Sequence, residues 1–169
     1  MALLLVGLLT AMPLHAQVSP FAAKAALLLN FVRFSEWPAS VTPAGALLTL
    51  CVVGDEALES ALSQIVKGQI VSGHTLDVRR VTAADEARGC ALLYVDDASR
   101  GLAQRLQDLP VLTVSDAPRF SATDGIVELT LENGHMGFSV NVDAANRSGV
   151  KLSSQLLRLA RIVPGSRPR

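Results

Sequence analysis

Two cysteines, Cys51 and Cys90, are the side chains of this chain with the clearest potential for covalent chemistry. Cys51 lies within one apolar run and Cys90 directly precedes another, so neighbouring buried strands would bring the two residues within bridging range. In an oxidising compartment such a pair favours a disulfide, which would stabilise the fold by about 4 kcal/mol. The alternative is a pair of reduced thiols that pack as small apolar groups. A redox enzyme is not predicted, because the Cys-x-x-Cys spacing is absent.

Residues for other catalytic chemistry are sparse. Beyond the first sixteen residues the chain has two histidines, His74 and His135, and no Gly-x-Ser-x-Gly motif that would present a nucleophilic serine. Two scattered histidines without other ligands at suitable spacing do not predict a metal site. Adjacent acidic residues such as Asp96 and Asp97 are typical of solvated turns, and no glycine-rich phosphate loop is present. We therefore expect no enzyme activity, no metal and no cofactor.

Two sets of polar residues lie beside apolar segments and would be costly to bury unless they are used. The first set is Asn30 with Phe31, Phe34, Glu36 and Trp37, which places an amide near an aromatic group. We interpret the three aromatic residues as anchors of the fold first and as interface residues second. The alternative is a core helix in which Asn30 caps a neighbouring backbone group.

The second set follows an apolar run and consists of Asn141, Lys151, Ser153 and Ser154. These residues are further candidates for a structural or interface role. Ser153 or Ser154 is most simply the N-cap of a final helix, because a serine oxygen there accepts a hydrogen bond from a free backbone N–H. Ligand contact is the alternative for this set.

The elements that position these residues follow from apolar periodicity. A helix is expected over residues 20–34, with Ser19 as its N-cap and Pro20 as its first residue. Apolar runs predict strands at residues 47–53, 76–81, 91–95 and 111–114, and helices at residues 56–67 and 99–106 lie between them. Such alternation is typical of α/β domains with a mainly parallel sheet and flanking helices.

The C-terminal part follows another pattern. Asn133-Gly134 predicts a β-hairpin between strands at residues 126–131 and 136–140. Helices are expected at residues 142–146 and 153–162, and in the second of these Leu156, Leu157 and Leu159 are expected to face the core. The predicted fold is thus a single α/β domain whose C-terminal hairpin is followed by helix.

The first sixteen residues resemble a secretory signal peptide. Their apolar run, residues 2–9, is too short to span a bilayer, and Ala16 is a small residue of the type that precedes a cleavage site. The expected organisation is a signal peptide over residues 1–16, one domain over residues 17–163 and a flexible tail over residues 164–169.

The composition and net charge indicate which classes of binding partner to expect. The chain is 50% hydrophobic and 18% charged, and its 15 basic and 15 acidic residues give a formal net charge of zero. A globular domain without a net positive field is not expected to bind nucleic acid.

Two long segments, residues 24–38 and residues 138–160, resemble the opening and closing signatures of the YfiR family of periplasmic proteins. The intervening segments 50–54 and 113–116 are similar to the family as well. The resemblance implies a periplasmic, homodimeric α/β regulator in which Cys51 and Cys90 occupy the positions of a family disulfide. The family's second cysteine pair, nearer the C-terminus, has no counterpart here.

The resemblance also implies a function. It predicts a regulatory binding protein that represses a membrane-bound diguanylate cyclase by binding the periplasmic sensor domain of the cyclase, and so controls cyclic di-GMP and biofilm formation. An OmpA-like outer-membrane lipoprotein is a second expected partner. The alternative is a periplasmic small-molecule receptor that holds its ligand near Asn141 and reports to a membrane histidine kinase.

Overall fold

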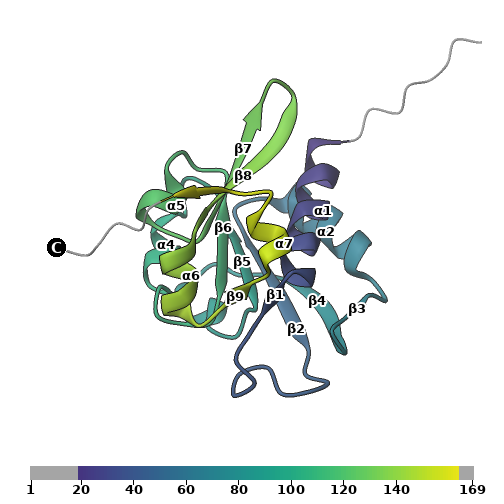
Figure 1. The fold of residues 1–169 in the computed structure, drawn as a ribbon. Coiled ribbons are helices and arrows are strands. Elements are labelled where there is room, and N and C mark those ends of the chain that lie inside the picture. The colour runs from purple at the N-terminus through teal and green to yellow at the C-terminus, as the bar shows by residue number, and fades with distance from the viewer. Residues whose placement is uncertain (1–18, 164–169) are drawn as a thin grey trace, which may run out of the picture.

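The computed structural model of the chain describes residues 19–163, so the predicted signal peptide and the predicted tail lie outside the described residues. The sheet has eight strands in the order β10-β8-β7-β6-β5-β2-β4-β3, and β1 and β9 form a separate pair. Neighbouring strands are parallel from β4 through β2, β5 and β6 to β7 (Figure 1). The predicted α/β class with a mainly parallel sheet is confirmed.

The strands are β1 (Ser35–Glu36), β2 (Leu48–Val53), β3 (Ile70–Val71), β4 (His74–Arg80), β5 (Leu92–Val95), β6 (Leu112–Ser115), β7 (Val127–Glu132), β8 (His135–Asn141), β9 (Lys151–Leu152) and β10 (Arg161–Val163). The helices are α1 (Pro20–Arg33), α2 (Glu56–Val66), α3 (Ala84–Ala87), α4 (Gly101–Gln104), α5 (Phe120–Thr123), α6 (Val142–Ser148) and α7 (Ser154–Leu157).

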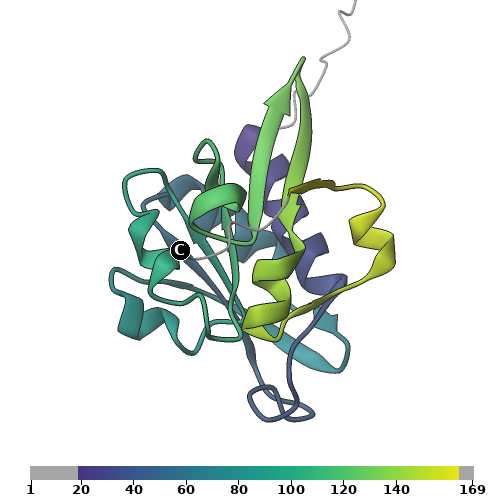
Figure 2. The ribbon, with the colours of Figure 1, turned by 60° about the vertical axis from the view of Figure 1, so that its left-hand side comes forward.

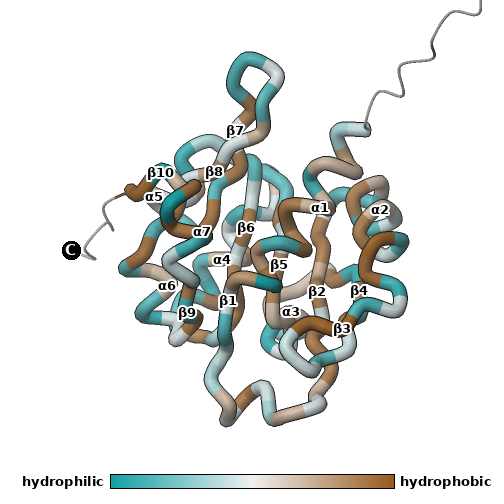
Figure 3. Tube along the Cα trace, turned by 45° about the vertical axis from the view of Figure 1, so that its right-hand side comes forward, coloured by the Kyte–Doolittle hydropathy of each residue, from teal (hydrophilic) through white to brown (hydrophobic). Residues whose placement is uncertain are grey.

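The sheet has a hydrophobic core on each face. Leu50 and Val52 of β2 pack in the cluster that includes α1 and α2, whereas Cys51 and Val53 pack in the cluster that includes α3, α4 and α5. This alternation follows from the two-residue period of a strand, and it explains why β2 is apolar along its whole length. The amphipathic character of α2 is visible in Figure 3 as an alternation of brown and teal along the helix.

Local sequence accounts for the ends of the two long helices. Asp55 caps α2, since its carboxylate accepts a hydrogen bond from the Leu58 N–H at 2.9 Å. Gly68 follows the helix with a φ of +74°, a conformation that glycine adopts at little cost. Pro20 begins α1 as predicted, and the Phe34 N–H closes its last turn on the Asn30 carbonyl oxygen.

The predicted hairpin joins β7 to β8. Glu132 pairs with His135 across a two-residue turn, and Asn133 and Gly134 have φ angles of +52° and +78°. Two positive φ angles are typical of a type I′ turn, the reason that Asn-Gly predicts a hairpin. The tip of the hairpin projects from the body of the domain (Figure 2).

The prediction of a long final helix was wrong. α7 is a single turn, and the chain then forms β10, which runs parallel to β8 at the edge of the sheet. Leu159, predicted to face the core, is exposed. The physical reason is that β8 offers an unpaired edge, and the β-branched residues Ile162 and Val163 are better suited to a strand there than to a helix.

Other differences concern short elements. α4 covers only Gly101–Gln104 of the predicted 99–106 helix, and β4 begins at His74, two residues earlier than predicted. The two-residue strands β1, β3 and β9 were not predicted, because a strand of that length has no periodicity of its own and exists only through its partner.

Candidate functional site

The two segments that carry the candidate residues lie side by side in the structure. Ser35 pairs with Leu152, and Glu36 pairs with Lys151 in the antiparallel β1–β9 ladder. The Ser153 N–H extends this contact by donating to the Phe34 carbonyl oxygen at 2.9 Å. These contacts join the end of α1 to the C-terminal segment of the chain. The candidate residues of both sets lie in or near these two segments.

The aromatic members of the first set have different surroundings. Phe31 is buried, and its ring meets the ring of Phe138 edge-on at a centroid distance of 5.0 Å. Phe34 is half-buried and packs against the same core cluster. Asn30 is half-buried on α1 and Glu36 is exposed. Phe31 and Phe34 therefore anchor the fold.

Three polar members of the second set lie at helix starts. The Asn141 carbonyl Oδ1 accepts from the Ala144 N–H at 2.9 Å, and its amide Nδ2 donates to the Ser121 carbonyl oxygen at 2.8 Å. Ser153 caps α7 by accepting from the Leu156 N–H at 3.1 Å, and Ser154 is the first residue of that helix. Lys151 is exposed on β9.

Trp37 is the member of the first set that reaches the surface with a fixed orientation. Its indole N–H donates to the Ala91 carbonyl oxygen at 2.9 Å, which ties the loop after β1 to the residue preceding β5. Two cavities of about 210 Å³ each adjoin Trp37, and Trp37, Thr42 and Leu48 line both of them. Because the indole N–H is already bonded, the ring offers its apolar surface for contact.

Two exposed apolar side chains adjoin Trp37. Val41 and Leu47 are 51% and 56% exposed, and both line the cavity that also contains Cys90. We refer to Trp37, Val41, Thr42, Leu47 and Leu48 as the Trp37 surface. Apolar groups of this kind that gather around an aromatic residue are typical of protein interaction sites.

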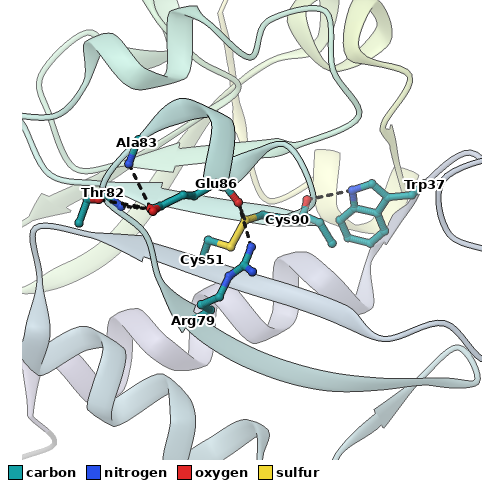
Figure 4. Close-up of a disulfide and its surroundings, with 8 residues drawn as sticks. Trp37, Cys51, Arg79, Thr82, Ala83, Glu86 and Cys90 are labelled. Atoms are coloured by element: carbon teal, nitrogen blue, oxygen red, sulfur yellow. Dashed lines mark hydrogen bonds between the residues drawn. A yellow bond between two sulfur atoms is a disulfide. The ribbon is translucent and has the colours of Figure 1, made fainter.

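The predicted disulfide is present, and one of its residues, Cys90, lines the cavity beside Trp37. Cys51 and Cys90 are bonded with a Cα–Cα distance of 5.9 Å, which links the wall of the cavity to the central strand β2 (Figure 4). The Glu86 carboxylate holds the loop between β4 and α3, because it accepts a hydrogen bond from the Thr82 N–H at 2.7 Å. This bond lowers the pKa of Glu86. The Arg79 guanidinium donates to the Glu86 carbonyl oxygen at 2.9 Å.

A charged cluster at the carboxyl ends of β5 and β6 was not predicted from the sequence. The Lys24 ammonium lies 2.6 Å from Asp116 Oδ2, 3.0 Å from Tyr94 Oη and 3.7 Å from Asp55 Oδ2. The Tyr94 hydroxyl donates to Asp116 at 2.9 Å. Doubly wound sheets often bind ligands at this edge, but here the cluster consists of mutual contacts that fasten α1 to the sheet.

The pKa shifts in this cluster agree with that role. Burial raises the pKa of Tyr94, and the neighbouring Asp116 carboxylate raises it further, so the phenol stays protonated at neutral pH. Burial is the largest influence on Asp116 and acts to raise its pKa, but the hydrogen bond and the charge of Lys24, together with the hydrogen bond from Tyr94, outweigh burial and leave this pKa below its ordinary value. Asp116 is thus a paired carboxylate and Tyr94 a neutral phenol, and neither of the two is poised for proton transfer.

The arrangement thus defines a class of protein: a doubly wound α/β domain whose mainly parallel sheet has a hydrophobic core on each face. Among residues 19–163, no group of three histidine, cysteine or carboxylate side chains is placed to hold a metal ion. Within the same range no helix combines the length and the apolarity needed to cross a membrane.

The comparison with known families agrees with the geometry. The chain matches the sequence profile of the YfiR/HmsC-like family over residues 21–161, and it belongs to that family. Proteins of this family are periplasmic regulators rather than enzymes. The membership is consistent with regulation of cyclic di-GMP signalling in the periplasm.

Sequence reasoning missed part of the site. Val41 lies between the predicted helix over residues 20–34 and the predicted strand over residues 47–53, and Leu47 was predicted as the first residue of that buried strand, whereas it precedes β2 and is exposed. An apolar residue, Val41, in a segment that contains Pro43 and Gly45 was the available signal, since such segments are ordinarily polar. The contact of Trp37 with Ala91 had no signal in the sequence, because it joins segments far apart along the chain.

Proposed function

We propose that this protein represses a membrane-bound diguanylate cyclase by binding the periplasmic sensor domain of the cyclase through the Trp37 surface. Export to the periplasm by residues 1–16 and relief by an OmpA-like outer-membrane lipoprotein are parts of the same proposal. The observation that carries it is the pair of exposed apolar residues, Val41 and Leu47, beside a tryptophan whose position is fixed by a backbone hydrogen bond.

Repression follows from differential binding. A protein that binds the inactive state of a receptor more tightly than the active state shifts the receptor toward inactivity. Moving a receptor from mostly active to mostly inactive requires about 5.5 kcal/mol of difference between the two affinities. A few apolar anchors in a water-excluding interface are able to supply a difference of this size. The disulfide and the Trp37 hydrogen bond favour binding because they hold the anchors in place beforehand.

The test is genetic and quantitative. Deleting the gene should raise intracellular cyclic di-GMP, and the wild-type gene should restore the lower level. A Val41→Asp/Leu47→Asp variant should fail to restore it, because two carboxylates in the contact region would have to be desolvated. Leu131→Asp is the matched control, since Leu131 is exposed on the distant β7–β8 hairpin.

Three outcomes contradict the proposal. An unchanged cyclic di-GMP level in the deletion strain would remove the cyclase as target. Full repression by the Val41→Asp/Leu47→Asp variant would remove the Trp37 surface as the contact. Equal loss of repression in Leu131→Asp would do the same, because the effect would then be independent of position. Each variant should retain the wild-type circular dichroism spectrum and the Cys51–Cys90 bridge.

The second candidate function is a small-molecule receptor that reports to a membrane histidine kinase. A polar cavity of about 410 Å³ beside Asn141, lined also by Asp124 and Arg147, favours it. Both polar side-chain atoms of Asn141 make contacts within the chain, so Arg147, together with Gln107 and Asp108 of the same cavity lining, is left to contact a ligand. A changed kinase output with unchanged cyclic di-GMP in the deletion strain, reversed by wild type and not by Arg147→Ala, supports this function.

A further inference from the structure

The outer edge of β8 is only partly covered by β10 in the part of the chain that the structure describes. β10 pairs with residues 139–141 of β8, and it begins at the base of the β7–β8 hairpin (Figure 2). The residues before β10 do not extend this pairing, because the N–H groups of Leu159 and Ala160 donate to carbonyl oxygens of α7. The edge of β8 over residues 135–138 therefore has no neighbouring strand on this side.

The register of β8 fixes which backbone groups face this open edge. The Asn141 N–H donates to the Ile126 carbonyl oxygen at 2.9 Å, so the odd-numbered residues of β8 direct their backbone groups toward β7. Backbone direction alternates along a strand, and Met136 and Phe138 therefore direct theirs away from β7. Because β10 begins opposite Ser139, both backbone groups of Met136 and the N–H of Phe138 have no ladder partner among residues 19–163. A further strand is able to bind such groups.

A groove lies at this open edge. It is a cavity of about 320 Å³, a size within the range of ligand sites, and residues of the hairpin line it together with Leu159 and Arg161. Leu159 is 75% exposed, so its apolar side chain is available for contact. Gly137 lies between the two outward-directed residues, and the absence of a side chain there lets another backbone approach closely. We refer to Met136, Gly137, Phe138 and Leu159 as the β8 groove.

The charges around the groove favour an uncharged occupant. The acidic and the basic side chain of its lining, Glu132 and Arg161, lie 3.3 Å apart and pair with each other. A charged ligand therefore has no unpaired opposite charge to bind in this lining. The donors and acceptors that remain are backbone groups of β8, and their spacing along the strand matches the spacing in another extended chain.

The residues on either side of β10 do not supply the missing strand. β10 runs parallel to β8, from Arg161 opposite Ser139 to Val163 opposite Asn141, so the chain continues away from the open segment. On the other side of β10, Leu159 and Ala160 are held by hydrogen bonds to α7. This arrangement favours a segment of another protein as the occupant of the groove.

We propose that the β8 groove binds an extended, uncharged segment of a partner protein, which adds to the sheet beside residues 135–138. The backbone of the segment bonds to Met136 and Phe138, and one of its apolar side chains packs against Leu159. Strand addition of this kind takes its affinity from backbone hydrogen bonds and its specificity from side-chain contacts. The β8 groove shares no residue with the Trp37 surface, so the proposal stands whether or not a cyclase is the target.

A model strand tests the proposal on the chain without residues 1–16. The probe is the capped peptide acetyl-Thr-Val-Thr-Val-Thr-amide, whose residues favour extended structure and carry no charge. Titration followed by amide NMR should saturate at millimolar peptide, and the bound peptide should slow hydrogen exchange at Met136 and Phe138. The fully N-methylated peptide keeps the same side chains but has no N–H to donate, so its dissociation constant should be at least about tenfold higher.

Two variants separate the groove from the rest of the hairpin. Leu159→Asp should raise the dissociation constant of the unmethylated peptide at least about tenfold, because its carboxylate would have to be desolvated against the peptide. Leu131→Asp is the matched control, since Leu131 is 70% exposed on the same hairpin but does not line the groove. This control should bind the peptide as the wild type does, and both variants should retain the wild-type circular dichroism spectrum.

Four outcomes overturn the proposal. The first is that the unmethylated peptide does not bind at millimolar concentration. Equal affinity of the two peptides would mean that the contact does not use backbone hydrogen bonds. Equal weakening by Leu159→Asp and Leu131→Asp would place the peptide outside the groove. Slow hydrogen exchange at Met136 and Phe138 in the free protein, lost on dilution, would mean that a second copy of the chain already covers this edge.

Discussion

Ser35 shows how a single buried oxygen affects stability. Its hydroxyl is buried and makes no hydrogen bond to any of residues 19–163, although its backbone takes part in the β1–β9 ladder. A buried polar atom without a partner costs free energy relative to an apolar atom of similar size. Ser35 therefore contributes to the β1–β9 ladder, which immediately precedes Trp37, through its backbone and not through its side chain.

The resulting prediction concerns Ser35→Ala. We expect the free energy of unfolding to stay equal or to rise by up to about 1 kcal/mol, because the substitution removes an unpaired hydroxyl. Ser121→Ala is the control, since the Ser121 hydroxyl donates to Glu128 at 2.9 Å and its loss should destabilise by about 1 kcal/mol. Urea midpoints of both variants measure these changes. A clear destabilisation by Ser35→Ala would show that the hydroxyl has a partner in solution.

The β1–β9 ladder is the element-scale link between the two candidate segments. It has only two residue pairs, and one of them sets Glu36 opposite Lys151. Because the ladder immediately precedes Trp37 in the chain, the stability of the ladder affects how firmly the Trp37 surface is held in place. Opposite charges across two strands stabilise a ladder modestly, and like charges destabilise it by a similar amount.

A charge exchange tests this pairing. Lys151→Glu should destabilise the protein by about 0.5 kcal/mol, because two carboxylates would then face each other. Adding Glu36→Lys to the same chain should recover most of the loss, and the recovery should shrink at high salt. Chemical unfolding followed by Trp37 fluorescence measures both effects. Additive losses in the double variant would mean that the two side chains do not interact.

On the scale of the whole molecule, the disulfide joins the central strand to the loop before β5. The bridge spans 39 residues of sequence, so its removal should lower the free energy of unfolding by about 4 kcal/mol on the chain-entropy estimate. Both cores share one sheet, and for that reason the molecule should still unfold in a single step.

The measurement compares two probes of a Cys51→Ala/Cys90→Ala variant. Trp37 is the single tryptophan, so its fluorescence reports on the candidate site while far-ultraviolet circular dichroism reports on the whole fold. The two unfolding curves should coincide at a lower denaturant concentration than in the oxidised wild type. Reductant should lower the stability of the wild type and leave the variant unchanged. Separate transitions for the two probes would contradict the single-step expectation.

The elements that the sequence determined by itself are those with a local cause. The period of apolar residues gave α1, α2 and the buried strands, a capping carboxylate began α2, and Asn133-Gly134 determined the hairpin. In each case a few adjacent residues decide the backbone geometry, so no distant partner is needed.

Only the tertiary structure decided the rest. The sequence placed Cys51 and Cys90 near each other and left the pairing open, and the parallel packing of β2 beside β5 joined them. The strand β10 replaced a predicted helix because the edge of β8 was available, and β1 exists only through β9. The hydrogen bond from Trp37 to Ala91 likewise joins segments that meet only in the folded chain. Such features depend on contacts between distant residues, whose free energy is not encoded in the local pattern of either partner.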